Sequence, residues 1–465
     1  MTNVIYANGI RANTGQYGVK IELDRLYGYV CADKPARVRK LGPPQHIPFD
    51  QLSKARWGII WPPQSPDDPA LNDKIEQHRA ALKPLIDHRL GQLEGKAVLE
   101  FSYEYGWTLQ DFFRKYGQDV AAPDHMEPSI IPYYVCLVGP PDRIPWDFQQ
   151  DLDGEYAVGR IWFDDVEDCT AYVKHLIDYE TAQPSPSLGR EALFVAPHHP
   201  DDEPTEASAN RLIKPLYQYV MDNAKIERTL LLGNDQSDHA ATKDNLLQRL
   251  TAKHPPALLF TASHGVEVDY GDGHQVDDEG ALLMQDWPRD WNQLDPKYFL
   301  AGRDVQQQGV QLNGLVAFCF ACFSGGAPAA EDWIPPHSTE LPAKIADTPF
   351  VARLPQKLLS HGALGFIGHV SRVWDYSFLG VAGKQPQLNN FYGAVFSLLG
   401  GQAIGHATDS LNRRSITLAG ELYDELQKPN HSKDHVTQLW MARNDFRGYV
   451  IIGDPAARLR LNVLQ

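Results

Sequence analysis

The sequence has few cysteines, no long apolar run and no basic cluster, and each absence excludes a class of protein. Five cysteines in 465 residues, an odd number, argue against a disulfide framework and fit a reducing compartment. Every apolar run is shorter than the roughly 18 residues of a membrane-spanning helix. The start of the chain lacks the basic and apolar regions of a secretory signal. We therefore expect a cytoplasmic protein without a membrane partner.

Basic residues are also outnumbered. The chain has 43 lysines and arginines against 59 acidic residues, which gives a formal net charge of −16. A nucleic-acid-binding protein usually carries a basic face, so we expect no nucleic-acid partner. The balance instead favours solubility and indicates little about the fold.

Hydrophobic residues make up 43% of the chain, and they occur as short apolar runs that alternate with segments of helical spacing. This alternation predicts an α/β fold with a mainly parallel sheet flanked by helices. We divide the chain into residues 1–125, 126–186 and 187–465. The first part is predicted to be a smaller α/β region without evident chemistry, in which Asn8-Gly9 and Asn13-Thr14-Gly15 are turns.

Two apolar runs end in reactive side chains. Residues 257–262 lead into His264 and Gly265, and residues 314–320 lead into Cys322. If the two strands are parallel neighbours, both side chains emerge at the carboxyl edge of the sheet, where such folds bind ligands. An imidazole can take the proton of a thiol and protonate a leaving amine. The amides of Gly265 and Cys322 are then candidates for an oxyanion hole.

Cys319 is the competing thiol. It lies three residues before Cys322, so on a regular strand it faces the other side of the sheet. It also lacks the Ser-Gly-Gly turn that follows Cys322 and Phe323. We therefore expect Cys319 to belong to the core.

An apolar strand with His264-Gly265, followed by another with Ala321-Cys322-Phe323-Ser324-Gly325, resembles the caspase-like (clan CD) cysteine peptidases. These include gingipains, legumains, metacaspases and bacterial CHAT domains. The resemblance to gingipains extends over roughly residues 130–465. It rests on the buried strand at 133–139 and on four short motifs that follow it. These motifs are Ile144-Pro145, Val158-Gly159-Arg160, Tyr179-Glu180 and the closing Gly453-Asp454-Pro455.

The resemblance implies a caspase-like cysteine endopeptidase with His264 and Cys322 as its catalytic dyad. It implies no cofactor and no metal, a protein or peptide substrate, and a possible activating protein or protease. In gingipains that cut after arginine, an aspartate before Gly-Arg lines the primary specificity pocket. Asp151 or Asp153 matches that position, which implies a basic residue before the scissile bond (P1). The alternative for both is a solvated acidic loop.

Trp374 and Asp375 follow the apolar run 363–370 and resemble the pocket-wall segment of the same families. They are therefore candidate substrate-binding residues, and a tryptophan at the rim of the core is the alternative.

The stretch from His199 to Glu203 supports a different function. His-Pro-Asp-Asp-Glu after a strand resembles the zinc-dependent N-acetylglucosaminyl deacetylases. Carried over, His199 and Asp202 are zinc ligands, Asp201 is the base, and Asp238-His239 supplies the third ligand. A caspase-like fold without activity, acting as a binding scaffold, is the third alternative.

The segment between the two reactive strands is acidic. It predicts either a local negative field or calcium binding, and a solvated loop is the alternative. The carboxylates are Glu267, Asp269, Asp272, Asp277, Asp278 and Glu279.

Overall fold

A ten-stranded sheet forms the centre of the molecule. The computed structural model describes residues 4–33, 47–117, 126–183, 191–224, 226–233, 239–290, 292–331, 343–381 and 386–460. From one edge to the other, the strands of the sheet are β5 (Leu99–Ser102), β4 (Trp57–Trp61), β6 (Tyr134–Val138), β7 (Ala157–Ile161), β18 (Tyr449–Gly453), β17 (Gly365–His369), β14 (Val316–Phe320), β10 (Leu258–Ala262), β8 (Glu191–Val195) and β9 (Arg228–Leu232). The predicted α/β class with a mainly parallel sheet is confirmed.

The direction of the strands changes once within the described sheet. β17 and β18 are antiparallel, whereas the other neighbouring pairs are parallel. The carboxyl ends of β10, β14 and β17 therefore lie at the same edge as the amino ends of β18 and β7. That edge, referred to below as the reactive edge, can receive residues from both halves of the sheet.

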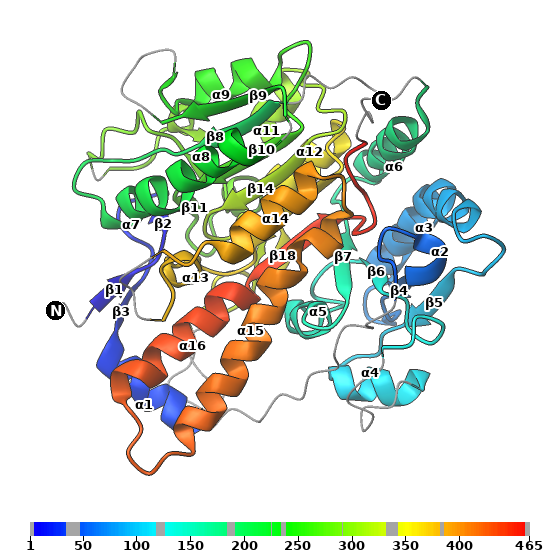
Figure 1. The fold of residues 1–465 in the computed structure, drawn as a ribbon, viewed down its shortest axis with the longest axis horizontal. Helices are drawn as coiled ribbons and strands as arrows, with labels where there is room; N and C mark the ends of the chain where they lie inside the picture. The colour runs from blue at the N-terminus through cyan, green and yellow to red at the C-terminus, as the bar shows by residue number, and fades with distance from the viewer. Residues whose placement is uncertain are drawn as a thin grey trace.

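Helices flank the sheet in two groups (Figure 1). Because both faces are covered, the central strands are apolar and buried along their whole length, as β10 and β14 are. One group contains α3 (Pro69–Gly91), α6 (Val166–Thr181), α11 (Gly302–Gln307) and α12 (Arg353–Ser360). The other contains α8 (Lys214–Asn223), α14 (Asn389–Leu399), α15 (Ile404–Leu426) and α16 (Lys433–Arg447).

Local signals set the ends of several helices. α4 (Leu109–Tyr116) begins with a capping box between Thr108 and Asp111 and ends at Gly117, whose φ is 82°. α9 (Lys243–Leu250) begins at Thr242, whose side chain accepts a hydrogen bond from the backbone N–H of Asn245. Residues close together in the sequence therefore mark these helix boundaries.

Residues 1–125 do not stay together. β4 and β5 extend the central sheet beside β6, so the sheet runs continuously across residue 125. The first described residues lie on the opposite side of the view in Figure 1, where β1 (Val4–Tyr6) and β3 (Lys20–Glu22) form an antiparallel pair. α1 (Leu23–Asp33) follows and packs on α16.

A four-stranded sheet stands beside the reactive edge. Its order is β13 (Phe299–Leu300), β12 (Leu282–Leu283), β11 (Gly265–Glu267) and β2 (Gly9–Arg11). The predicted turn at Asn8-Gly9 is therefore wrong: Gly9 begins an extended strand, because the free edge of β11 pairs with it. The predicted turn at 13–15 is confirmed, since the N–H of Gly15 donates to the Arg11 carbonyl at 2.8 Å.

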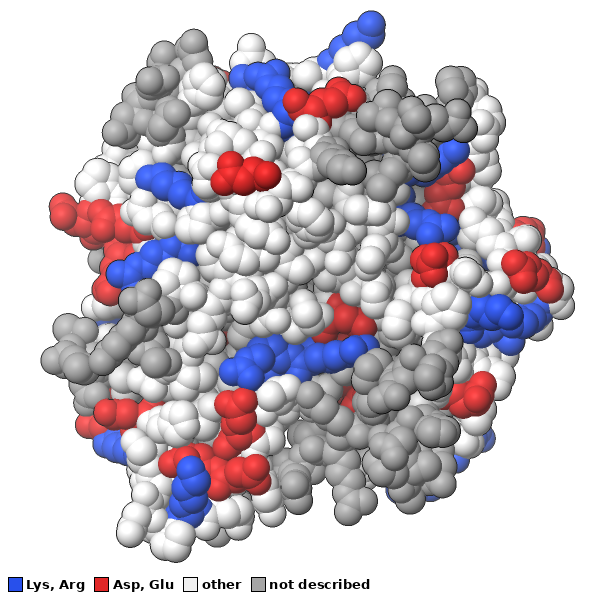
Figure 2. All heavy atoms as spheres, in the orientation of Figure 1, with Lys and Arg blue, Asp and Glu red and all other residues white. Residues whose placement is uncertain are grey.

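The surface and the cysteines agree with the composition. On the face shown in Figure 2, basic and acidic side chains are intermixed. All five cysteines lie in described segments and are free thiols. No helix among the described residues is both long and apolar enough to cross a bilayer.

Candidate active site

β10 and β14 are parallel neighbours, paired from Leu258–Val316 to Ala262–Phe320. His264 and Cys322 each follow the last paired residue by two positions, so both lie at the reactive edge. The two segments are in contact there, since a Cβ added to Gly265 would lie 2.0 Å from the carbonyl oxygen of Cys322. Only glycine allows this approach. The prediction that the two strands are parallel neighbours is confirmed.

Cys322 is held in a tight turn. Its Sγ accepts a hydrogen bond from the Val373 N–H at 3.3 Å, and Phe323 follows with a φ of 56°. A non-glycine residue in this left-handed region costs about 1–3 kcal/mol and is held by surrounding structure. Burial, and then the charge of Glu267, raises the pKa of the Cys322 thiol well above its ordinary value. The thiol is therefore protonated at neutral pH.

His264 is oriented by Asp202. Its Nε2 lies 2.8 Å from Oδ2 of Asp202, and this oxygen also accepts a hydrogen bond from the Thr205 hydroxyl. The other oxygen of Asp202, Oδ1, accepts one from the Tyr17 hydroxyl. Burial opposes ionisation of this carboxyl, but His264 and the hydrogen bonds lower the pKa of Asp202 well below its ordinary value. The Nε2 of His264 thus donates to the carboxylate, and Nδ1 is the ring nitrogen that remains for another partner. Among the described residues Nδ1 has no hydrogen-bond partner.

This use of Asp202 does not fit the zinc-site interpretation. Nε2 of His199 donates a hydrogen bond to the Met284 carbonyl, 3.1 Å away, and burial followed by the charge of His264 lowers the pKa of His199 to about 4. Asp201 is exposed, and Asp238 lies outside the described residues. In the described segments no three His, Cys, Asp or Glu side chains are arranged to hold a metal ion. The sequence singled out Asp202 but assigned it the wrong neighbour.

The segment after β17 forms a wall beside Cys322, and Asp445 of α16 holds it. The two oxygens of Asp445 accept hydrogen bonds from the N–H groups of Trp374 and Ser377, each at 2.7 Å. Trp374 is buried, and Asp375 lines a cavity of about 360 Å³. Burial raises the pKa of Asp375 to about 6. Nothing in the local sequence marked Asp445, whose partners lie far along the chain.

Asp151 and Asp153 end α5 (Trp146–Asp153), just before β7 and therefore at the reactive edge. Asp151 is already paired with Arg447, at 2.9 Å. Asp153 is buried and accepts a hydrogen bond from the Val158 N–H at 3.1 Å, and burial raises its pKa well above the ordinary value. Neither carboxyl is thus an open anion in this structure.

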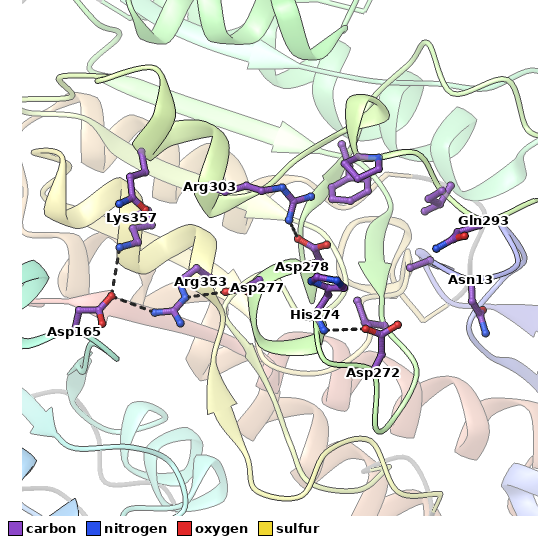
Figure 3. Close-up of a pocket in the computed structure, with 16 residues that line it drawn as sticks. Asn13, Asp165, Asp272, His274, Asp277, Asp278, Gln293, Arg303, Arg353 and Lys357 are labelled. Atoms are coloured by element: carbon purple, nitrogen blue, oxygen red, sulfur yellow. Dashed lines mark hydrogen bonds and ion pairs between the residues drawn. The ribbon is translucent and has the colours of Figure 1, made fainter.

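Three carboxylates of the acidic segment 267–279 are paired with arginines. Figure 3 shows Asp278 pointing to Arg303 and Asp277 pointing to Arg353 beside a cavity. Asp277 and Arg353 are 3.3 Å apart, and the cavity has a volume of about 640 Å³. Glu267 is buried and contacts Arg372 at 2.7 Å. The described residues provide no cluster of metal ligands here, so the calcium alternative has no support.

The first described residues cover this site. β2 pairs with β11 immediately after His264, and Tyr17 packs its ring against the His264 ring at 5.8 Å. His264 and Cys322 are both fully buried as a result of such contacts. This coverage was not predicted from the sequence, because the segment is short and distant from His264 and Cys322 along the chain.

Comparison with solved structures finds one that reaches a TM-score of 0.50, which supports a shared fold. A solved structure described as a protease has a TM-score of 0.50 at 12% identity, over 87% of this chain and 78% of that one. The Arg-specific cysteine proteinase gingipain R (RgpB) gives 0.46 at 14% identity, over 90% and 80%. The complex of Porphyromonas gingivalis RgpB pro- and mature domains gives 0.43 at 13%, over 87% and 80%. No curated protein matches significantly.

The family is shown by sequence. The model of peptidase family C25 matches residues 132–460, which is more than half of the chain and includes β10, β14 and the wall after β17. The chain therefore belongs to peptidase family C25 and is a cysteine peptidase.

Proposed function

We propose that the protein hydrolyses peptide bonds with Cys322 as nucleophile and His264 as general base and acid. The observation that carries this proposal is the parallel pairing of β10 and β14, which brings the two strand ends together at one edge. Asp202 is the positioning residue, because its hydrogen bond at Nε2 leaves Nδ1 of His264 to exchange protons. No cofactor takes part in these steps.

The reaction begins when Sγ of Cys322 attacks the carbonyl carbon and the thiol proton passes to His264. The amides of Gly265 and Cys322 stabilise the oxyanion. The C–N bond then breaks, the leaving amine takes the proton from His264, and a thioester remains on Cys322. Water gives a proton to His264 as it attacks the thioester, the C–S bond breaks, and the sulfur recovers the proton as the carboxylic acid leaves.

The decisive experiment compares two thiols. Peptide hydrolysis is measured for the wild type, Cys322→Ala and the matched control Cys319→Ala. Cys319 lies within β14, and burial raises its pKa to about 12, so its loss affects packing rather than chemistry. We expect activity to vanish with Cys322→Ala and to remain with Cys319→Ala. Equal loss in both variants would contradict the dyad, and binding of peptides without turnover in any protein would favour the scaffold.

The P1 preference is tested with the same proteins. A basic P1 side chain needs an accessible carboxylate. Asp151 would have to exchange Arg447 for the substrate, and Asp153 would have to become ionised inside the core. A fluorogenic panel with Arg, Lys, Asn and Ala at P1 decides between a basic and a neutral preference. If Arg or Lys is preferred, Asp151→Asn is expected to remove that preference without altering hydrolysis of the Ala peptide.

A further inference from the structure

Residues 4–22 form a β-hairpin that lies on the dyad, referred to below as the N-terminal hairpin. Its outer part is the β1–β3 pair, and its inner part is β2 with the returning residues 16–18. The strand entering the site is buried: Ala7, Asn8 and Ile10 are at most 3% exposed. A surface segment of this length would ordinarily leave several side chains open to solvent.

The main chain of Asn8 makes the two hydrogen bonds expected of a bound peptide. Its carbonyl oxygen accepts from the N–H of Gly265 at 3.1 Å, which is the amide assigned above to the oxyanion hole. Its N–H donates to the Val373 carbonyl at 3.0 Å, on the wall beside Cys322. The carbonyl of Asn8 thus occupies the place where a peptide carbonyl would be attacked. The bond that follows it joins Asn8 to Gly9.

Gly9 fits because it has no side chain. A Cβ at this position would lie 2.0 Å from Oε1 of Glu267 and 3.1 Å from Cβ of Cys322. Glu267 cannot easily move, since it is buried and Arg372 holds both of its oxygens. Gly18, on the returning strand, contacts the same carboxylate, and a Cβ there would lie 1.9 Å from Oε2.

Beyond Gly9 the strand continues as a substrate strand would. Ile10 and Arg11 pair in parallel with Val266 and Glu267. The turn that follows, Ala12 and Asn13, borders the cavity of Figure 3. On the other side, the hydroxyl of Tyr17 donates to Asp202, so the hairpin also engages the partner of His264.

We propose that the N-terminal hairpin is a built-in inhibitor that occupies the peptide-binding groove, with Asn8 at P1 and Gly9 after the scissile position (P1′). This rests on the proposed function. The groove then accepts a small uncharged side chain at P1, and Glu267 restricts P1′ to glycine. The thiol stays buried and protonated until the hairpin leaves.

Opening the hairpin tests the proposal. Gly18→Ala places a methyl group against the fixed Glu267 carboxylate, and overpacking of this kind shifts such equilibria by roughly tenfold to hundredfold. Gly28→Ala, in α1 of the same region, is the matched control because a Cβ there meets nothing within 4 Å. Iodoacetamide labelling of Cys322, located by peptide mass spectrometry, measures access independently of catalysis. Tyr17→Phe is a milder second variant that removes one hydrogen bond to Asp202.

We expect Cys322 in Gly18→Ala to be labelled about tenfold to hundredfold faster than in the wild type or Gly28→Ala, with a parallel rise in peptide hydrolysis. Tyr17→Phe is expected to lie between. Faster labelling without hydrolysis would uphold the hairpin and refute the peptidase proposal. Equal labelling of the wild type, Tyr17→Phe and Gly18→Ala would overturn the hairpin proposal.

A peptide pair tests the register. A synthetic peptide with the sequence of residues 5–11 is added to Gly18→Ala, and its counterpart has alanine in place of Gly9. The first is expected to compete with fluorogenic substrates or to be cut between Asn8 and Gly9, and the second to do neither. Equal inhibition by both peptides, or cleavage at another bond, would overturn the assignment of Gly9 to P1′.

Discussion

Replacing Asp202 by asparagine, compared with the same change at Asp201, separates the peptidase mechanism from the zinc-site alternative. The substitution keeps the size of the side chain but removes the charge that accepts the hydrogen bond from Nε2 of His264 at 2.8 Å. A hydrogen bond to a charged group is worth about 1.5–3 kcal/mol, and each 1.36 kcal/mol changes a rate about tenfold. We therefore expect kcat/KM to fall by about 10- to 150-fold.

Asp201→Asn is the matched control, since it changes the same chemical group one residue away. Asp201 is exposed, and its φ of 61° is a conformation that asparagine tolerates well. Its activity is expected to stay within about twofold of the parent. In the zinc alternative both variants lose activity, because Asp202 is then a zinc ligand and Asp201 is the catalytic base.

The assay is peptide hydrolysis with purified protein, in the wild type and in the Gly18→Ala background, so that coverage of the site does not limit the rate. The Asp202 variant also weakens the contact with Tyr17, so labelling of Cys322 is measured in parallel. Labelling that rises while hydrolysis falls agrees with a positioning role. Equal activity of the two asparagine variants would refute the reasoning.

Two further predictions concern stability. The largely buried side chain of Glu180 contacts Arg89 at 2.7 Å. Burial raises the pKa of Glu180, but the pairing with Arg89 outweighs burial and lowers the pKa to about 2. The ion pair stabilises the fold by about 3 kcal/mol above pH 4.5, and this stabilisation is lost as the pH falls toward 2. The urea midpoint of the wild type should therefore approach that of Glu180→Gln as the pH is lowered over that range. Calcium should leave the thermal midpoint unchanged, because Asp278 is already paired with Arg303; a rise would contradict this.

The sequence predicted the central part of the fold because its signals are local. β10 and β14 are apolar runs of five residues, buried on both faces, and each ends near a glycine. Their parallel pairing follows from the strand–helix alternation. The sequence did not predict that β4 and β5 join the same sheet, because strand order depends on tertiary packing.

The interpretation of Asp202 and Asp151 shows the limit of motif reasoning. His-Pro-Asp-Asp-Glu suggested metal binding, yet the fold turns Asp202 toward His264 in a distant strand end. Likewise, Asp151 matched a specificity position, but Arg447 from the end of α16 reaches it. A motif identifies a reactive side chain, but the tertiary fold determines which residue that side chain contacts.

The sequence by itself determined an α/β fold with a thiol and an imidazole after two buried strands, because apolar runs and glycines encode strands and their ends locally. Its motifs added the resemblance to gingipains. Only the tertiary structure decided what faces those groups. The carbonyl of Asn8 lies at Gly265 because an unpaired strand edge binds the extended backbone that the fold brings beside it. Such backbone pairing leaves no pattern of side chains in the sequence.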